Sequence, residues 1–220
     1  MMELLQAHYE ALSVLIAMAT LLVWLTYAQL LYLNYRRQRR PHLIINLAQG
    51  YHLGATVLLS NMSAEPIHVE CVMLVVHCRG RQAVRQVSEL PYREGPDGPA
   101  ELSSRTRQGP LASGGYMSLG TFRELLETCA ADVVAEWQLE NVEHDDYAAF
   151  IEHLELRVAA IYASEDLPVG ALRRFRIRDT DTGVEILPMT LQTVRMATRS
   201  QRREVIAWLE TCAQDGSQSA

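Results

Sequence analysis

The longest apolar stretch of the chain lies close to its N-terminus. Residues 11–35 contain no Asp, Glu, Lys or Arg over 25 positions. A helix of that length would be about 37 Å long, which exceeds the hydrocarbon core of a bilayer, about 30 Å. The pattern predicts a transmembrane helix over 11–35, preceded by a short tail over 1–10.

Two other interpretations fit this stretch less well. A cleavable signal peptide needs a basic leader and an apolar run of about 7 to 15 residues. Here residues 1–10 carry Glu3 and Glu10 and no basic residue. A buried helix of a globular core would need protein around its whole circumference, and a chain of 220 residues leaves little for that purpose. A permanent anchor is therefore the favoured interpretation.

A basic linker over 36–41 follows the apolar stretch, and it sets the expected orientation. Its four arginines are Arg36, Arg37, Arg39 and Arg40. Because arginines next to a span stay on the cytoplasmic side, we expect the N-terminal tail outside and the C-terminal domain in the cytoplasm. Tyr32 and Tyr35 suit the inner membrane interface. The arginines either set topology alone or also bind anionic lipid headgroups.

Gln29 is the most polar side chain inside the expected span. An amide in hydrocarbon can hydrogen-bond a partner helix, so Gln29 predicts helix association and a homodimer. Its position near Tyr35 also allows it to reach toward the interface instead. No Gly-x-x-x-Gly pattern in the span supports association.

Apolar and alternating runs predict that the rest of the chain is mainly β. Strands are expected at 43–47, 55–60, 67–78, 82–87, 171–177 and 184–187. A hairpin turn at 179–183 joins the last two strands. Alternation at the start of the third strand places Ile67, Val69 and Cys71 on one face. Residues 147–162 fit either a helix or a strand.

Two helices and one long loop complete the expected domain. Residues 91–120 hold four of the eight prolines and six of the twelve glycines, which predicts an irregular loop. Thr121 and Glu124 fit a capping box at the start of a helix over 121–137. A second amphipathic helix is expected at 198–212, with Arg202 outside its apolar stripe, before a disordered tail over 213–220. The fold class expected for 42–212 is an immunoglobulin-like β-sandwich decorated with helices.

Charge and composition narrow the classes of partner. Residues 41–220 carry sixteen arginines against 24 acidic residues, a net charge of −8. A domain this acidic is not expected to bind nucleic acid. All basic residues are arginine, as in proteins from GC-rich bacterial genomes, so we expect a bacterial inner-membrane protein whose partners are the lipid bilayer and a protein.

The sequence contains no recognisable catalytic or cofactor-binding motif. The four cysteines have no C-x-x-C spacing and are predicted to be reduced thiols in the cytoplasm. The best polar cluster lies within 143–153, where His144 and His153 stand among acidic residues. It would support a metal-assisted hydrolase, although its spacing matches no established ligand pattern. No cofactor and no metal are expected.

One arginine-rich segment is the best candidate for binding. Arg174, Arg176 and Arg178 alternate with Phe175 and Ile177, which places the three arginines on one strand face. They either pair with the acidic part of the chain itself or bind a partner. We expect a non-enzymatic scaffold or regulatory protein that docks a protein partner at the membrane. The alternatives are a ligand sensor that signals through Gln29-dependent helix association, and the hydrolase.

Overall fold

The computed structural model describes residues 2–38, 40–78, 80–88, 106–137, 151–162, 165–181 and 183–218. The chain forms two compact units, Met1–Arg40 and Pro41–Ala220. The first unit consists of helix α1 (Met2–Gln38). Within α1, residues Ala11–Tyr35 are long and apolar enough to cross a membrane, and none of this stretch is buried against protein. By length and composition α1 is therefore a membrane span or a signal sequence.

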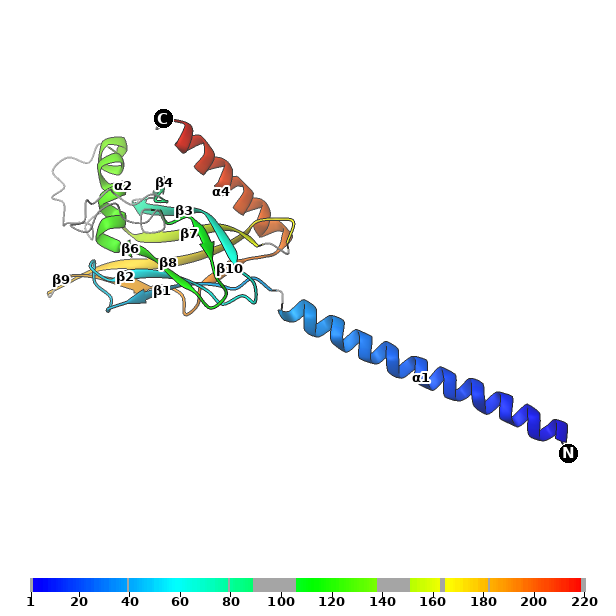
Figure 1. Ribbon diagram of the computed structural model, residues 1–220. Helices are drawn as coiled ribbons and strands as arrows, with labels where there is room; N and C mark the ends of the chain where they lie inside the picture. The colour runs from blue at the N-terminus through cyan, green and yellow to red at the C-terminus, as the bar shows by residue number, and fades with distance from the viewer. Residues whose placement is uncertain are drawn as a thin grey trace, which may run out of the picture. The chain divides into compact units, whose positions relative to one another are not determined.

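The second unit is a mainly antiparallel β domain with two sheets (Figure 1). Sheet A contains β1 (Leu43–Ala48), β2 (Thr56–Asn61) and β6 (Tyr116–Thr121), in the order β1-β2-β6. Both pairings in sheet A are antiparallel. Inward and outward side chains alternate along β2, whose buried positions include Val57 and Leu59.

Sheet B is the larger sheet and is built around one long central strand. Its main path has the order β10-β8-β7-β3-β4, while β5 pairs with β3 and β9 pairs with β8. Its strands are β3 (Ile67–Cys78), β4 (Arg81–Gln86), β5 (Gly109–Leu111), β7 (His153–Tyr162), β8 (Val169–Thr180), β9 (Gly183–Pro188) and β10 (Val194–Met196). Nine of the twelve residues of β3 belong to the buried apolar core, as expected for a strand with cover on both faces.

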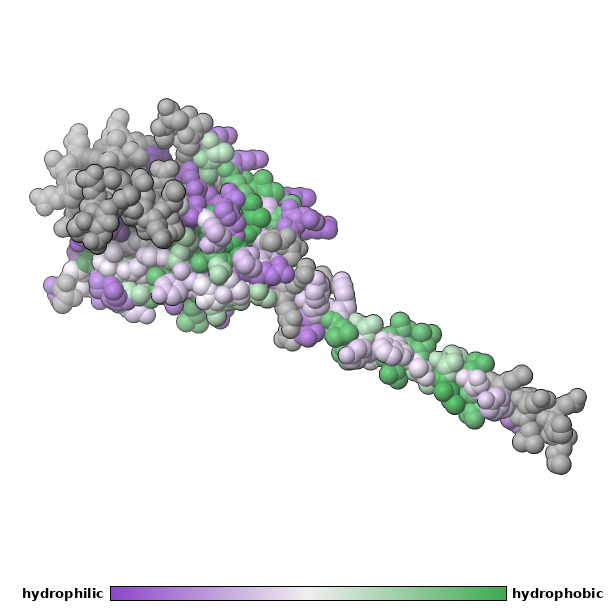
Figure 2. Space-filling model, in the orientation of Figure 1, coloured by the Kyte–Doolittle hydropathy of each residue, from purple (hydrophilic) through white to green (hydrophobic). Residues whose placement is uncertain are grey.

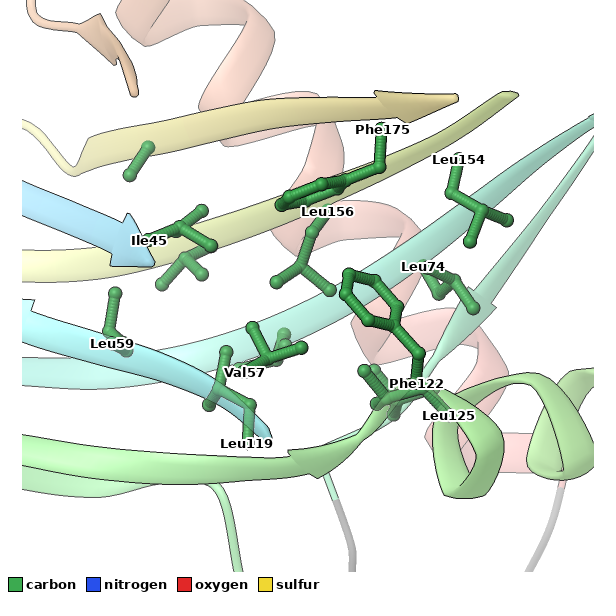
Figure 3. Close-up of a cluster of buried hydrophobic side chains, with 14 of the residues drawn as sticks. Ile45, Val57, Leu59, Leu74, Leu119, Phe122, Leu125, Leu154, Leu156 and Phe175 are labelled. Atoms are coloured by element: carbon green, nitrogen blue, oxygen red, sulfur yellow. The ribbon is translucent and has the colours of Figure 1, made fainter. Parts of the chain in front are cut away.

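The main hydrophobic core is shared by the two sheets and helix α2 (Phe122–Trp137). Figure 3 shows Val57 and Leu59 of sheet A and Leu154 and Leu156 of sheet B among the side chains of this core. The Phe122 ring of α2 packs edge to face against the Phe175 ring, with 5.0 Å between the ring centroids. The capping box at the start of α2 forms as expected, because Thr121 and Glu124 each accept a hydrogen bond from the other's backbone N–H. The predicted helix at 121–137 is confirmed.

Arg173 joins the two sheets from within the core. Its side chain is buried and donates to the carbonyl oxygen of Ile45 and, at 3.3 Å, to the side-chain oxygen of Asn46. Burial lowers the pKa of this guanidinium. The Thr193 hydroxyl accepts a 2.9 Å hydrogen bond from the Ile45 N–H. The outward backbone groups of edge strand β1 at Ile45 are thus satisfied by sheet B.

Two sequence expectations need correction at this level, and one alternative that the sequence left open is resolved. The loop predicted for 91–120 contains β5 and β6; Leu119 faces the core from β6, although its neighbours include glycines. The ambiguous segment at 147–162 is a strand over its described part, β7. The tail expected to be disordered from 213 is helical as far as Gln218.

Helix α4 (Arg199–Gln218) covers part of the outer face of sheet B and makes a second, smaller core. Trp208 and Val205 pack there against Gly170, whose missing side chain makes room: a Cβ would lie only 2.6 Å from Val205 Cγ2. Arg202 was expected outside the apolar stripe, but it is buried and donates to Glu165 at 3.0 Å and to the carbonyl oxygen of Ala197. It lies one turn before Val205 and therefore shares its face.

Cys71 does not lie on the face predicted for it. The pairing of β3 with β7 is irregular between Val69 and Cys71, so alternation is interrupted there. As a result Ile67 and Val69 belong to the main core, whereas Cys71 joins the α4 core with Met73.

A disulfide joins Cys71 to Cys212 of α4, over a Cα–Cα distance of 6.8 Å. The expectation of four reduced thiols is therefore wrong for this pair. Cys78 and Cys129 are buried in the main core and are not part of this bond. No spacing pattern indicates the pair, because the two cysteines are 141 residues apart.

Candidate functional site

The candidate site is the part of the outer face of sheet B that α4 leaves open. Along β8, Arg174, Arg176 and Arg178 are exposed, whereas Phe175 and Ile177 are buried between them. The alternation in the sequence therefore placed the three arginines correctly on one face. Their role in binding a partner stays a prediction.

A buried carboxylate anchors this face. Glu155 of β7 is 1% exposed and lies opposite Arg174 in the sheet. It accepts hydrogen bonds of 2.5 Å from Nε of Arg157 and from Nε of Arg174. Burial by itself would raise the pKa of Glu155, but the hydrogen bonds and charges of Arg174 and Arg157 outweigh it and lower the pKa. Glu155 is thus ionised at neutral pH and fixes both guanidinium groups.

Arg157 also connects the site to α4. Its guanidinium lies 5.1 Å from the centre of the Trp208 ring, within the range of a cation–π contact. The side chain of Arg157 is 17% exposed, compared with 51% for Arg174. Arg157 is therefore a structural arginine, and Arg174 presents its charge to solvent.

Two stacked histidines extend the face toward β3. The rings of His77 and His153 are 4.0 Å apart and nearly parallel. Burial and then the charge of His153 lower the pKa of His77, so His77 is neutral at physiological pH. Among the residues that the structure describes, Nε2 of His77 is buried without a hydrogen-bond partner. The stack lies beside the arginine row, since His153 lies opposite Arg176 in the sheet.

The far end of the row is neutralised by a surface ion pair. Arg178 donates a 2.7 Å hydrogen bond to Glu185 of β9, and both side chains are well exposed. Within the described ranges, Arg176 makes no ion pair. The face therefore carries four arginines and two glutamates, a local charge of +2 on a domain whose net charge is −8. Such a face can hold an acidic surface in a defined position.

The expected membrane residues lie on α1 or directly after it. Tyr32, Tyr35 and Gln29 are exposed on the helix. Arg40 is exposed, Arg36 and Arg37 lie in α1 with side chains outside the described part, and Arg39 lies outside the described residues. Their roles in orientation, headgroup binding and helix association stay predictions.

The proposed metal cluster within 143–153 is only partly described. Glu143, His144, Asp145 and Asp146 lie outside the described residues. Of the rest, Glu152 is exposed and His153 stacks on His77. In the described part of the chain, no group of three or more His, Cys, Asp or Glu side chains could hold a metal ion.

Sequence reasoning missed Glu155 and Arg157 as members of this site. Both were visible as the polar positions of an alternating run, but their partner on β8 depends on strand pairing.

Comparisons with protein-family models, with curated proteins and with solved structures found no match to this chain.

Proposed function

We propose that this protein is a single-pass inner-membrane protein whose β domain docks a protein partner without catalysing a reaction. The observation that carries the proposal is the arginine row Arg174, Arg176 and Arg178, which is exposed on one sheet face and fixed at its Arg174 end by buried Glu155. A preorganised basic face on an acidic domain favours a partner with an acidic surface. Two sheets that share one core also suit an immunoglobulin-like sandwich, an architecture common in binding domains.

The domain is proposed to face the cytoplasm, with residues 1–10 outside. The four arginines after the span support this side, because moving their charged side chains across the hydrocarbon core would cost free energy. The Cys71–Cys212 bond supports the opposite side, since stable disulfides are rare in the cytosol. We rank the arginines higher because all four lie directly after the span, where the basic bias acts most strongly on orientation.

Topology can be tested directly. A C-terminal alkaline phosphatase fusion of the wild type is expected to be inactive and the matching fluorescent-protein fusion bright. Changing Arg36, Arg37, Arg39 and Arg40 to Glu should invert or mix the two signals, because the basic bias is removed. A wild-type phosphatase fusion that is active would place the domain outside and would agree with a permanent disulfide.

Partner docking predicts a specific effect of charge reversal. In the full chain, Arg176→Glu combined with Arg178→Glu should weaken recovery of the partner about tenfold, since repulsion of about 1.4 kcal/mol has that effect. The measurement is affinity purification from detergent-solubilised membranes followed by quantitative mass spectrometry. Arg203→Glu, at an exposed position on α4, is the matched control. Equal recovery of every protein by the two variants would contradict the proposed face.

A further inference from the structure

The outer face of sheet A is a second surface, and it has no charged strand residue. Register and burial assign nine positions to it, one from the end of β2 and the others from the three strands. They are Ile44, Asn46, Ala48, Thr56, Leu58, Ser60, Met62, Tyr116 and Ser118. In a domain with 40 charged residues among 180, nine outward positions without charge are unusual. Figure 2 shows mostly pale residues of intermediate hydropathy on the side that carries β1 and β2. The side that carries α4 shows both strongly hydrophilic and strongly hydrophobic residues.

The apolar members of this face gather at one end of the sheet. Tyr116 is 71% exposed and lies opposite Ser60, which in turn lies opposite Ile44. Met62 is 59% exposed and donates its backbone N–H to the carbonyl oxygen of His42 at 2.8 Å. The exposed Met and Tyr therefore lie at the end of sheet A where the domain begins at Pro41.

The length of the connecting chain limits how far this end of the domain can lie from the end of the span. Tyr35 ends the apolar span and His42 follows seven residues later. Three helical residues and four extended residues cover roughly 20 Å at most. Met62, which is hydrogen-bonded to His42, thus lies within that reach of the membrane boundary, whichever side of the membrane holds the domain.

We propose that the outer face of sheet A rests on the lipid headgroup layer around the anchor. Tyr116 suits this layer because an aromatic ring with a hydroxyl prefers the interface, and the uncharged Ser, Thr and Asn side chains avoid the cost of burying charge. The arginines after the span, together with exposed Arg195, which contacts the carbonyl oxygen of Pro41, complement anionic headgroups. Because the anchor tethers the domain to the bilayer, the effective concentration of lipid at this face is high. A small apolar contact is therefore sufficient for the face to bind lipid.

This inference rests on α1 as a membrane span and deepens the proposed function. If sheet A lies on lipid, the arginine row on the outer face of sheet B points away from the membrane. The partner is then bound on the face of the domain that is turned away from the lipid.

Quenching by brominated lipid tests the proposal on the full chain in nanodiscs of phosphatidylcholine with phosphatidylglycerol. We expect brominated lipid to quench strongly the fluorescence of the tryptophan introduced by Met62→Trp or by Tyr116→Trp. Tyr51→Trp is the control, because Tyr51 is also exposed but lies in the β1–β2 turn at the opposite end of the strands. Ser60→Asp in the Met62→Trp background should reduce quenching, whereas Ser60→Asn should not.

Trp24 within the span separates the two possible failures. Quenched Trp24 with no quenching at 62 and 116 would overturn the lipid contact while leaving the anchor intact, and would assign this face to a protein or to solvent. Unquenched Trp24 would overturn the membrane span, and with it the proposed function. Equal quenching at 51, 62 and 116 would also overturn the proposal, because contact would then not be specific to one face.

Discussion

Cys212→Ser is expected to lower the free energy of unfolding by about 5 kcal/mol relative to the oxidised wild type. The bond links residues 141 positions apart, and closing a loop of this length removes much conformational entropy from the unfolded chain, by about that amount. The loss should appear as a lower urea midpoint for the full chain in detergent micelles. Trp208, buried beside the disulfide in the α4 core, reports the transition by fluorescence.

Reductant supplies the control for this prediction. Treated wild type should unfold at nearly the same urea concentration as Cys212→Ser, and the variant itself should not respond to the reductant. If the wild type were equally stable with and without reductant, the bond would not contribute to the folded state. Serine in place of a buried cysteine also costs some stability, and the reduced wild type measures that part separately.

Glu155→Gln is expected to destabilise the domain by about 3 kcal/mol, the range found when one partner of a buried ion pair is removed. The amide keeps the shape of the carboxyl group but places a neutral side chain between the guanidinium groups of Arg157 and Arg174. Arg157 loses most, because its side chain is largely buried. The measurement is again the urea midpoint at neutral pH.

The pH dependence of stability should identify the same carboxylate. Because the folded-state pKa of Glu155 is lowered, its contribution is complete above the unfolded value of about 4.3 and is lost as pH falls through the folded pKa. The wild type should therefore lose stability in acid more steeply than Glu155→Gln.

Glu185→Gln is the matched control for both measurements. It breaks the exposed pair with Arg178 and should cost under about 1 kcal/mol. Similar losses for Glu155→Gln and Glu185→Gln would mean that Glu155 is not an anchor of the basic face.

The strands that the sequence predicted are those with enough residues to show a pattern. β3 was predicted with its observed ends, β1, β2, β4 and β9 within one residue at each end, and β8 within three residues, because each combines a run of apolar or alternating positions with turn residues. β5 and β10 have three residues each, too few for any periodicity. β6 was hidden by neighbouring glycines, and its strand character depends on its pairing with β2.

The sequence predicted which face of the strand carries the site, but not the hydrogen bonds and ion pairs that its residues make. Alternation was sufficient to put Arg174, Arg176 and Arg178 on one side of β8. The same alternation implied that Arg173 points inward, yet nothing in the sequence shows that the carbonyl group of Ile45 would receive it. The partners of Glu155 and of Cys71 depend on which strands and helices become neighbours, and local pattern carries no information on that.

The irregularity between Val69 and Cys71 divides β3 into two halves of opposite parity. Odd-numbered residues before it and even-numbered residues after it, among them Ile67 and Leu74, serve the same core. Glu70 is the extra residue at this point and has no partner of its own in β7, so deleting it would make the pairing regular and leave both halves of the strand on their present faces. Deleting one residue farther along, between Val72 and Val76, would instead turn the rest of the strand inside out. The length of β3 is therefore less constrained at Glu70 than on either side of it.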